Sequence, residues 1–149
     1  MPHNFKDFPE LTNSQMQVYY FESPHKQITE SFRAKVIKVT DGDTIRVEAD
    51  FRDFDFPIRF LNTAAPERKE AGGIESQKWL EALVLNQEVD IIIDTKNRVG
   101  KWGRLLGEIF FLGRSINEES MNTGHSVRFD QRKQSMIPDF NKELETIKW

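Results

Sequence analysis

A short basic run offers the clearest charged chemistry in this sequence. After Asp94 the chain places four cations within eleven residues and no second acid: Lys96, Arg98, Lys101 and Arg104. Such a run could contact phosphate groups, although the whole chain has a formal net charge of -3. Domains that coat nucleic acid by bulk electrostatics are usually strongly basic, so any phosphate contact here must be local. The same run is equally typical of a solvated loop.

Other side chains that commonly carry chemistry are absent or isolated. The 149 residues contain no cysteine, which excludes disulfides, thiolate nucleophiles and zinc–thiolate sites. The histidines His3, His25 and His125 stand far apart, so we assign no histidine base and no histidine metal site. The length is typical of one domain with a single core.

The first part of the chain shows no sustained period and no targeting signal. Asp7, Glu10 and Glu22 interrupt the stretch in which a signal peptide needs a continuous apolar run. No segment approaches membrane-spanning length. We therefore expect an N-terminal extension over residues 1–32, a domain over residues 33–149, and a soluble, cytoplasmic, monomeric protein.

Alternating apolar and polar residues begin after this extension. Two runs between residues 33 and 47 alternate in the manner of half-buried strands, with Asp41 and Gly42 between them. Asp-Gly in this position predicts a hairpin, because glycine tolerates the positive φ that a tight turn needs. A third strand is expected over residues 56–61, and Pro66 stops further sheet pairing.

The later patterns complete the expected fold. Apolar residues at helical spacing predict an amphipathic helix over residues 73–86. Strands are expected at residues 89–93 and 105–111, followed by short helices at residues 115–121 and 139–147. Five short strands with a helix between the third and fourth predict an α+β fold, a five-stranded OB-type barrel with short C-terminal helices.

Four short motifs, taken in order along the chain, form a family pattern. They are VTDGDT at residues 39–44, RFLNTAAPE at residues 59–67, KWGR at residues 101–104, and Ile116-Asn117-Glu118 followed by Gly124. Together they resemble the staphylococcal-nuclease-like (thermonuclease) domain, and the resemblance covers residues 33–130, roughly two thirds of the chain.

The resemblance implies a site for phosphodiester hydrolysis. Arg59 and Arg104 would clamp the phosphoryl group, since a planar guanidinium donates two parallel hydrogen bonds to phosphate oxygens. Glu67 would orient or deprotonate the attacking water, two roles that look the same in a sequence. Asp43 would ligate calcium, with the backbone carbonyl of Ala65 as a further ligand.

The sequence departs from the family at Ala64, where the family places a second metal-binding aspartate. Alanine has no side-chain donor, so calcium affinity should fall and the ion would depend on Asp43, backbone oxygen and water. Asp41 or Asn62 could compensate if either side chain points inward.

Lys101 and Trp102 match the lysine and aromatic residue that contact the nucleotide in the family. A ring at Trp102 could stack on a base or sugar without reading the base sequence, which implies little sequence specificity. An aromatic residue at the edge of the core is the alternative interpretation. Past Gly124 the resemblance fades.

Two functions compete at this stage. The first is a calcium-dependent endonuclease that hydrolyses DNA and RNA, preferably single-stranded, without sequence specificity. The second is a non-catalytic module that binds nucleic acid or another partner and has an impaired metal site. The trio Arg59, Glu67 and Arg104 favours the enzyme, because a binding module has no evident need for a water-positioning carboxylate. Ala64 favours the module.

Overall fold

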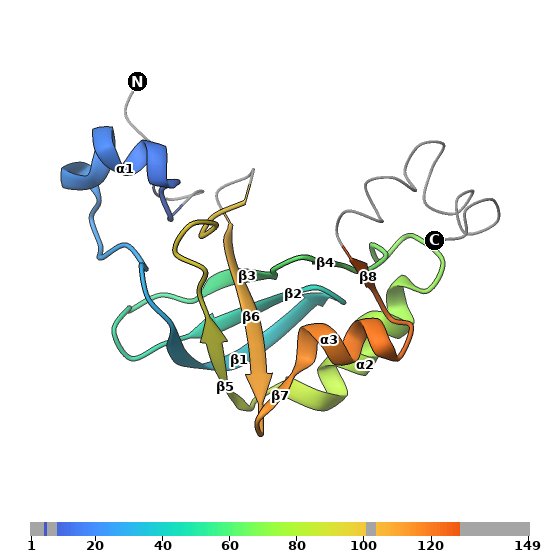
Figure 1. The fold of residues 1–149 in the computed structure, drawn as a ribbon. Coiled ribbons are helices and arrows are strands. Elements are labelled where there is room, and N and C mark those ends of the chain that lie inside the picture. Colours follow the sequence, from blue (N-terminus) through green and yellow to red (C-terminus); the bar gives the residue numbers. More distant parts are fainter. Residues whose placement is uncertain (1–4, 6–8, 101–103, 129–149) are drawn as a thin grey trace, which may run out of the picture.

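Five strands close into a barrel in the computed structural model, which describes residues 5, 9–100 and 104–128. They are β1 (Phe32–Asp41), β2 (Thr44–Glu48), β3 (Phe56–Phe60), β5 (Glu88–Ile92) and β6 (Leu105–Phe111). The strand order is β3-β2-β1-β5-β6, and a parallel pairing of β3 with β6 closes the barrel, while the other neighbours are antiparallel (Figure 1). The predicted five-stranded OB-type barrel and α+β class are confirmed.

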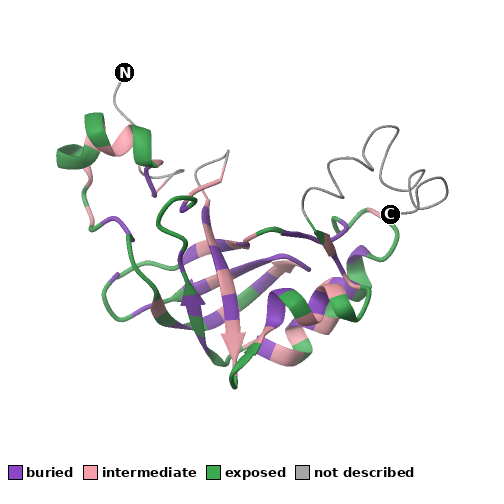
Figure 2. Ribbon diagram, in the orientation of Figure 1, coloured by how far each residue is buried: buried purple, intermediate pink, exposed green. Residues whose placement is uncertain are grey.

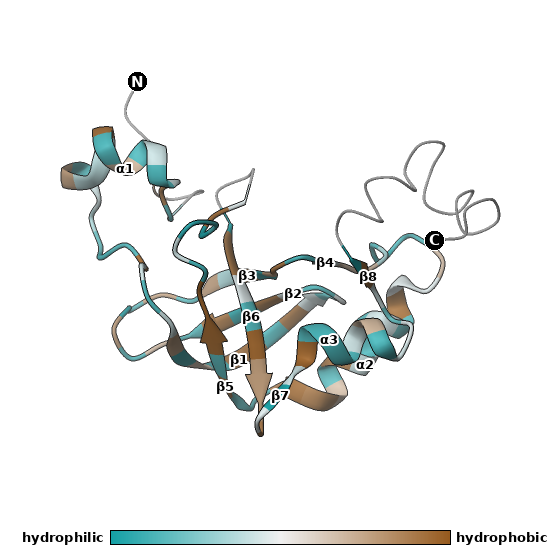
Figure 3. Cartoon of the chain, in the orientation of Figure 1, coloured by the Kyte–Doolittle hydropathy of each residue, from teal (hydrophilic) through white to brown (hydrophobic). Residues whose placement is uncertain are grey.

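Alternation along the strands builds the barrel core. In β6 the inward residues Leu105, Gly107 and Ile109 are buried and their neighbours are only partly covered. This period of two is the one that the sequence shows, because successive side chains of a strand point to opposite faces. Figure 3 shows hydrophobic and hydrophilic segments interleaved along the barrel strands. The largest fully buried side chains of the barrel are Phe56, Phe60, Ile45, Ile58, Ile91, Leu105 and Ile109.

Two helices cover the barrel close to their predicted positions. Helix α2 (Gly73–Val84) lies between β3 and β5 in the chain and buries Leu80 and Val84 in the core. It ends two residues before its predicted end. Helix α3 (Ile116–Asn122) follows β6, and the left-handed Gly124, with φ of 83°, comes directly after its last turn. The helix expected at residues 139–147 lies outside the described residues.

Three two-residue strands were not predicted. They are β4 (Thr63–Ala64), β7 (Arg114–Ser115) and β8 (Val127–Arg128). Strand β4 pairs with β8, so the segment that leads from β3 to α2 is held to the chain after α3. The third barrel strand itself ends at Phe60, because the chain turns at Asn62, where φ is 58°.

The N-terminal segment is more ordered than the sequence pattern indicated. It contains helix α1 (Asn13–Tyr19) and the 3-10 helix η1 (Tyr20–Glu22). Thr12 and Gln15 form a reciprocal capping box at the start of α1, a Thr-x-x-Gln signal that was present in the sequence. No residue of α1 is buried, as Figure 2 shows, yet Leu11 before it is fully buried. The division of the chain into an extension over residues 1–32 and a domain over residues 33–149 stays a prediction.

Among the described residues, no helix combines the length and the apolar character needed to cross a membrane.

Candidate nucleolytic site

The turn between β1 and β2 holds the first site residues. Gly42 does not adopt the left-handed φ that the hairpin interpretation expected. Close packing requires a glycine there instead, because a Cβ atom would lie 2.6 Å from the Cβ of Ser76 on α2 and 2.8 Å from that of Ala65. Gly42 therefore lets helix α2 and the segment after β4 approach the turn that carries Asp43.

Asp43 is buried, and several donors hold its carboxylate. Oδ2 accepts hydrogen bonds from the backbone N–H of Ala65 at 2.9 Å and from Nη2 of Arg59 at 3.2 Å. Oδ1 accepts one from the Thr44 hydroxyl at 3.0 Å. A buried carboxylate with donors on both oxygens has a fixed direction. Ala65 contacts Asp43 through its N–H, and the binding of calcium by the Ala65 carbonyl stays a prediction.

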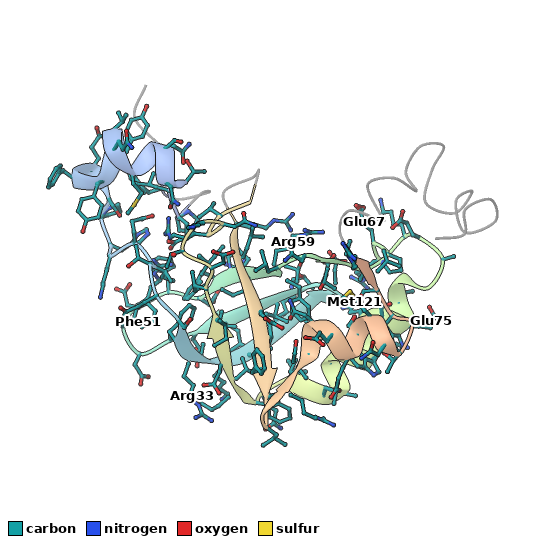
Figure 4. All side chains as sticks on the ribbon, in the orientation of Figure 1. Arg33, Phe51, Arg59, Glu67, Glu75 and Met121 are labelled. Atoms are coloured by element: carbon teal, nitrogen blue, oxygen red, sulfur yellow. The ribbon has the colours of Figure 1, made fainter. Side chains whose placement is uncertain are left out.

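The closing strand pair of the barrel brings the two predicted arginines together. Arg59 on β3 is in register with Leu106 on β6, and Arg104 comes directly before that strand. Asn117 of α3 forms hydrogen bonds to both sides of this strand pair. Its side-chain amide donates to the carbonyls of Leu61 and Gly107 at 3.0 and 3.3 Å. Arg59 and Glu67 both lie on the upper side of the barrel in Figure 4, whereas Arg33 and Phe51 lie at its lower left.

Asp41, in the β1–β2 turn, interacts electrostatically with two further carboxylates. Burial raises the pKa of the Asp41 carboxyl above its ordinary value, and the charges of Asp43 and Glu67 raise the pKa further. Arg68 opposes this rise through a backbone hydrogen bond and its charge. Like charges close to one another disfavour ionisation, so the two neighbouring carboxylates add to the effect of burial on the pKa of Asp41.

Arg104 belongs to the same cluster. Burial lowers the pKa of its guanidinium, and the nearby charge of Arg59 lowers that pKa further. The carboxylates Asp43, Asp41 and Glu67 act in the opposite direction. The structure thus brings together four of the predicted site residues, and we call these two arginines and three carboxylates the site cluster.

Glu67 is exposed and lies in the segment between β4 and α2. Its backbone N–H donates to Oε1 of Glu70 at 2.6 Å, and its carbonyl accepts from the Glu70 N–H at 2.8 Å. The start of α2 presses against this turn, because a Cβ atom at Gly73 would lie 1.9 Å from the carbonyl oxygen of Glu67. Glycine at this position lets the helix begin where it does, and so helps to place Glu67.

The residues of the basic run do not all belong to the site cluster. Lys101 and Trp102 lie outside the described residues, so their nucleotide contacts stay a prediction. Arg98, which the sequence grouped with the basic run, is buried with 3% of its surface exposed and is not part of an exposed phosphate patch. Asp41 was considered only as a substitute ligand, although its place in the Asp-Gly-Asp turn was a usable signal.

The donor chemistry of the site cluster fits a hard cation such as calcium, which prefers carboxylate oxygens. Ala64 is fully buried, and its methyl side chain supplies no oxygen for a metal. Within the described residues, no three acidic or histidine side chains converge in the arrangement of a metal-binding group. The side-chain part of the fit therefore rests on the Asp43 carboxylate.

Sequence comparisons identify similar proteins. The chain is 32% identical over 98 residues to an uncharacterized endonuclease of Escherichia coli O157:H7, covering 65% of this chain and 61% of that protein. It is 33% identical over 79 residues to a micrococcal nuclease of Shigella flexneri, covering 53% and 42%. It is 28% identical over 97 residues to an uncharacterized endonuclease of Haemophilus influenzae, covering 65% and 52%. No protein-family model matches the chain.

The matches cover only part of the similar proteins. This chain spans between 42% and 61% of the length of the three relatives described above.

Proposed function

From the distant homology of this chain to the staphylococcal-nuclease-like family, we propose that it is a calcium-dependent phosphodiesterase that hydrolyses DNA and RNA without sequence specificity. The observation that carries the proposal is the site cluster, in which Arg59 and Arg104 share one charged site with Asp43 and Glu67. Single-stranded nucleic acid is the expected substrate.

The two arginines bind the phosphoryl group. Each guanidinium stays charged and donates paired hydrogen bonds, so it stabilises the negative charge that builds up on the phosphoryl oxygens. The bond from Nη2 of Arg59 to Asp43 sets the direction of that guanidinium before substrate arrives. Lysine offers no planar fork and cannot replace either residue equivalently.

Glu67 acts on the attacking water. An ionised carboxylate only accepts hydrogen bonds, so it holds the water by its proton and is the group that can take that proton. Calcium held by Asp43 and the Ala65 carbonyl would add positive charge against the phosphate. The water oxygen forms the new bond to phosphorus, the bond from phosphorus to the leaving oxygen breaks, and the leaving oxygen takes a proton from solvent.

A second candidate function is a nucleic-acid-binding module without catalysis. The specific observation in its favour is Ala64, a fully buried side chain without a donor at the place where the family binds its metal. Such a module would keep the phosphate contacts of Arg59 and Arg104 and lose the hydrolytic step.

A hydrolysis assay on denatured DNA separates the two functions. Calcium is titrated from micromolar to tens of millimolar concentrations with the full chain, Glu67→Gln and Ala64→Asp. We expect cleavage by the full chain at high calcium, loss of cleavage in Glu67→Gln, and a lower calcium requirement in Ala64→Asp. Glu75→Gln, an exposed carboxylate on the first turn of α2, is the matched control and should cleave normally.

The outcomes decide between enzyme and module. Binding of the DNA without cleavage in every variant would sink the nuclease proposal. Thermal unfolding of Ala64→Asp with and without calcium shows whether the added buried carboxylate is tolerated, so a negative result with that variant remains interpretable.

A further inference from the structure

A second group of charges lies inside the molecule. The Glu10 carboxylate is 2.6 Å from Nη2 of Arg52 and 3.3 Å from Nη2 of Arg98. All three side chains are only 2% exposed. The three residues come from the N-terminal segment, the β2–β3 connection and the β5–β6 connection, and we call them the buried cluster.

The guanidinium of Arg98 is held by the N-terminal segment. Nε donates to the carbonyl of Ile28 at 2.7 Å, and Nη2 donates to the same carbonyl. Nη1 donates to the carbonyl of Leu11 at 2.9 Å and to Oδ1 of Asn13 at 3.1 Å. With Glu10, these acceptors occupy the planar fork of donors that arginine provides. Arg98 therefore anchors the β5–β6 connection to the N-terminal segment.

More contacts join the same two segments. The side-chain N–H of Asn13 donates to the carbonyl of Thr95 at 3.0 Å, and the N–H of Ile93 donates to the Ser31 hydroxyl at 2.9 Å. The first part of the β5–β6 connection, residues 93–98, is thus hydrogen-bonded at several points to the N-terminal segment.

Residues 98–100, which follow this anchored part, pair with residues 104–106, which include Arg104. The carbonyl of Arg98 accepts from the N–H of Leu106 at 2.8 Å, and the N–H of Gly100 donates to the carbonyl of Arg104 at 2.7 Å. Val99 and Leu105 form a bridge between these two bonds. The backbone of Arg104 is consequently fixed against residues 98–100, whose own position depends on the Arg98 anchor.

We propose that Glu10 and Arg98 are positioning residues, which fix the backbone of Arg104 in the site cluster by tying the β5–β6 connection to the N-terminal segment. The inference rests on the proposed function, since it concerns the phosphoryl-binding arginine. It assigns the N-terminal segment a role in catalysis without any contact with substrate. A misplacement of a catalytic group by about 1 Å can cost roughly a hundredfold in rate, so such an anchor has a measurable consequence.

The buried cluster contains its own control. Arg52 binds the same carboxylate as Arg98, has the same burial, and donates to the carbonyl of Lys26 at 2.7 Å. Its guanidinium stacks over the rings of Phe54 and Phe56, with 4.9 and 4.6 Å to the centroids. These contacts lie outside residues 98–106. A purely structural role of the cluster predicts equal effects of Arg52→Lys and Arg98→Lys, whereas a positioning role does not.

Steady-state cleavage of a single-stranded oligonucleotide by the folded full chain gives the first readout. We expect Arg98→Lys to lower kcat by roughly ten- to a hundredfold with little change in KM, because the displaced group acts mainly in the transition state. Arg52→Lys should stay within about twofold of the original kcat when compared at equal folded fraction. Equal losses in the two variants, or no loss in Arg98→Lys, would overturn the proposal.

Two variants at exposed positions test the same anchor in case Arg98→Lys unfolds the protein. Asn13→Ala removes two bonds at the exposed edge of the anchor, and Gln17→Ala changes an exposed residue of the same helix. We expect kcat to fall by roughly two- to fivefold in Asn13→Ala and to remain unchanged in Gln17→Ala. Equal kcat values for the two variants would count against the anchor.

Amide hydrogen exchange tests the anchor without any catalysis. In Arg98→Lys, the amides of Gly100 and Leu106 should exchange about tenfold faster or more, while the barrel amide of Val36 keeps its protection. Arg52→Lys should leave the exchange rates of these three amides unchanged relative to one another. If the original chain does not cleave, the nuclease proposal fails, and the exchange comparison alone decides whether Arg98 holds residues 98–100 against residues 104–106. Unchanged exchange at Gly100 and Leu106 would refute the positioning role.

Discussion

The buried cluster and the site cluster use the same two kinds of side chain in opposite ways. The buried cluster has two arginines on one carboxylate, and the acceptors of the N-terminal segment satisfy Arg98 fully. The site cluster has two arginines and three carboxylates. Arg59 remains 19% exposed there, and the buried side chains of the other cluster are 2% exposed.

The pKa shifts of two arginines express this difference. Burial lowers the pKa of both Arg98 and Arg104. For Arg98 the neighbouring Glu10 opposes the effect. For Arg104 the neighbouring Arg59 adds to it, and the carboxylates of the site cluster oppose it. A bound anion would stabilise two guanidinium groups that repel each other. An arginine whose donors are already occupied would gain no such stabilisation. The comparison separates an arginine whose donors are occupied by the N-terminal segment from one that has a second guanidinium beside it.

The largest expected effect concerns the buried cluster. Glu10→Ala leaves two buried arginines without their carboxylate, and breaking a buried ion pair in this way costs roughly 3–5 kcal/mol of stability. Urea unfolding followed by circular dichroism measures the loss. Glu22→Ala, an exposed acid of the same segment, is the control and should change stability by less than about 0.5 kcal/mol. A similar small effect of Glu10→Ala would remove the distinction between the clusters.

The next effect concerns the site cluster. Arg104→Lys keeps the charge and loses the planar pair of donors, so cleavage should fall by roughly a hundredfold to a thousandfold. Arg33→Lys is the matched control, because Arg33 pairs with Glu88 at 3.6 Å on an exposed face of the barrel. Initial rates on denatured DNA measure both. Comparable rates for Arg104→Lys and Arg33→Lys would contradict the assigned role.

An anion should distinguish the two clusters without catalysis. Inorganic phosphate at ten times its dissociation constant stabilises a folded protein by about 1.4 kcal/mol through mass action. We expect this rise in the original chain and in Arg52→Lys, and its loss in Arg104→Lys. Thermal unfolding with and without phosphate measures it. A rise that survives in Arg104→Lys would place the anion elsewhere.

The smallest effect is a pH dependence at Asp41. Because its folded-state pKa is raised above the ordinary 3.8, the folded protein binds this proton more readily than the unfolded chain does. Its contribution to stability is therefore present below pH 3.8 and is lost as the pH rises through the raised pKa. Asp41→Asn should remove this fall, which unfolding curves from pH 3 to pH 7 in a calcium chelator would reveal. An unchanged pH profile would mean that folding does not raise the pKa of Asp41.

The sequence by itself determined the barrel strands, the main helix and the order of the motifs. These features are local, since period-two alternation, helical spacing and an Asp-Gly turn each depend on neighbours within one segment. The strand over residues 105–111 was predicted with the limits that the structure shows, and helix α2 ended within two residues of its prediction. The motifs also identified Arg59, Arg104, Asp43 and Glu67, which the fold brings into one cluster.

Only the tertiary structure decided what each charge does. Arg98 and Arg104 belong to one basic run, yet the first is buried against the N-terminal segment and the second lies in the site cluster. Gly42 was expected for its φ and is required by the approach of α2. A charged residue's role depends on the partners that distant segments supply, and those partners, Glu10 above all, leave no periodic signal in the sequence.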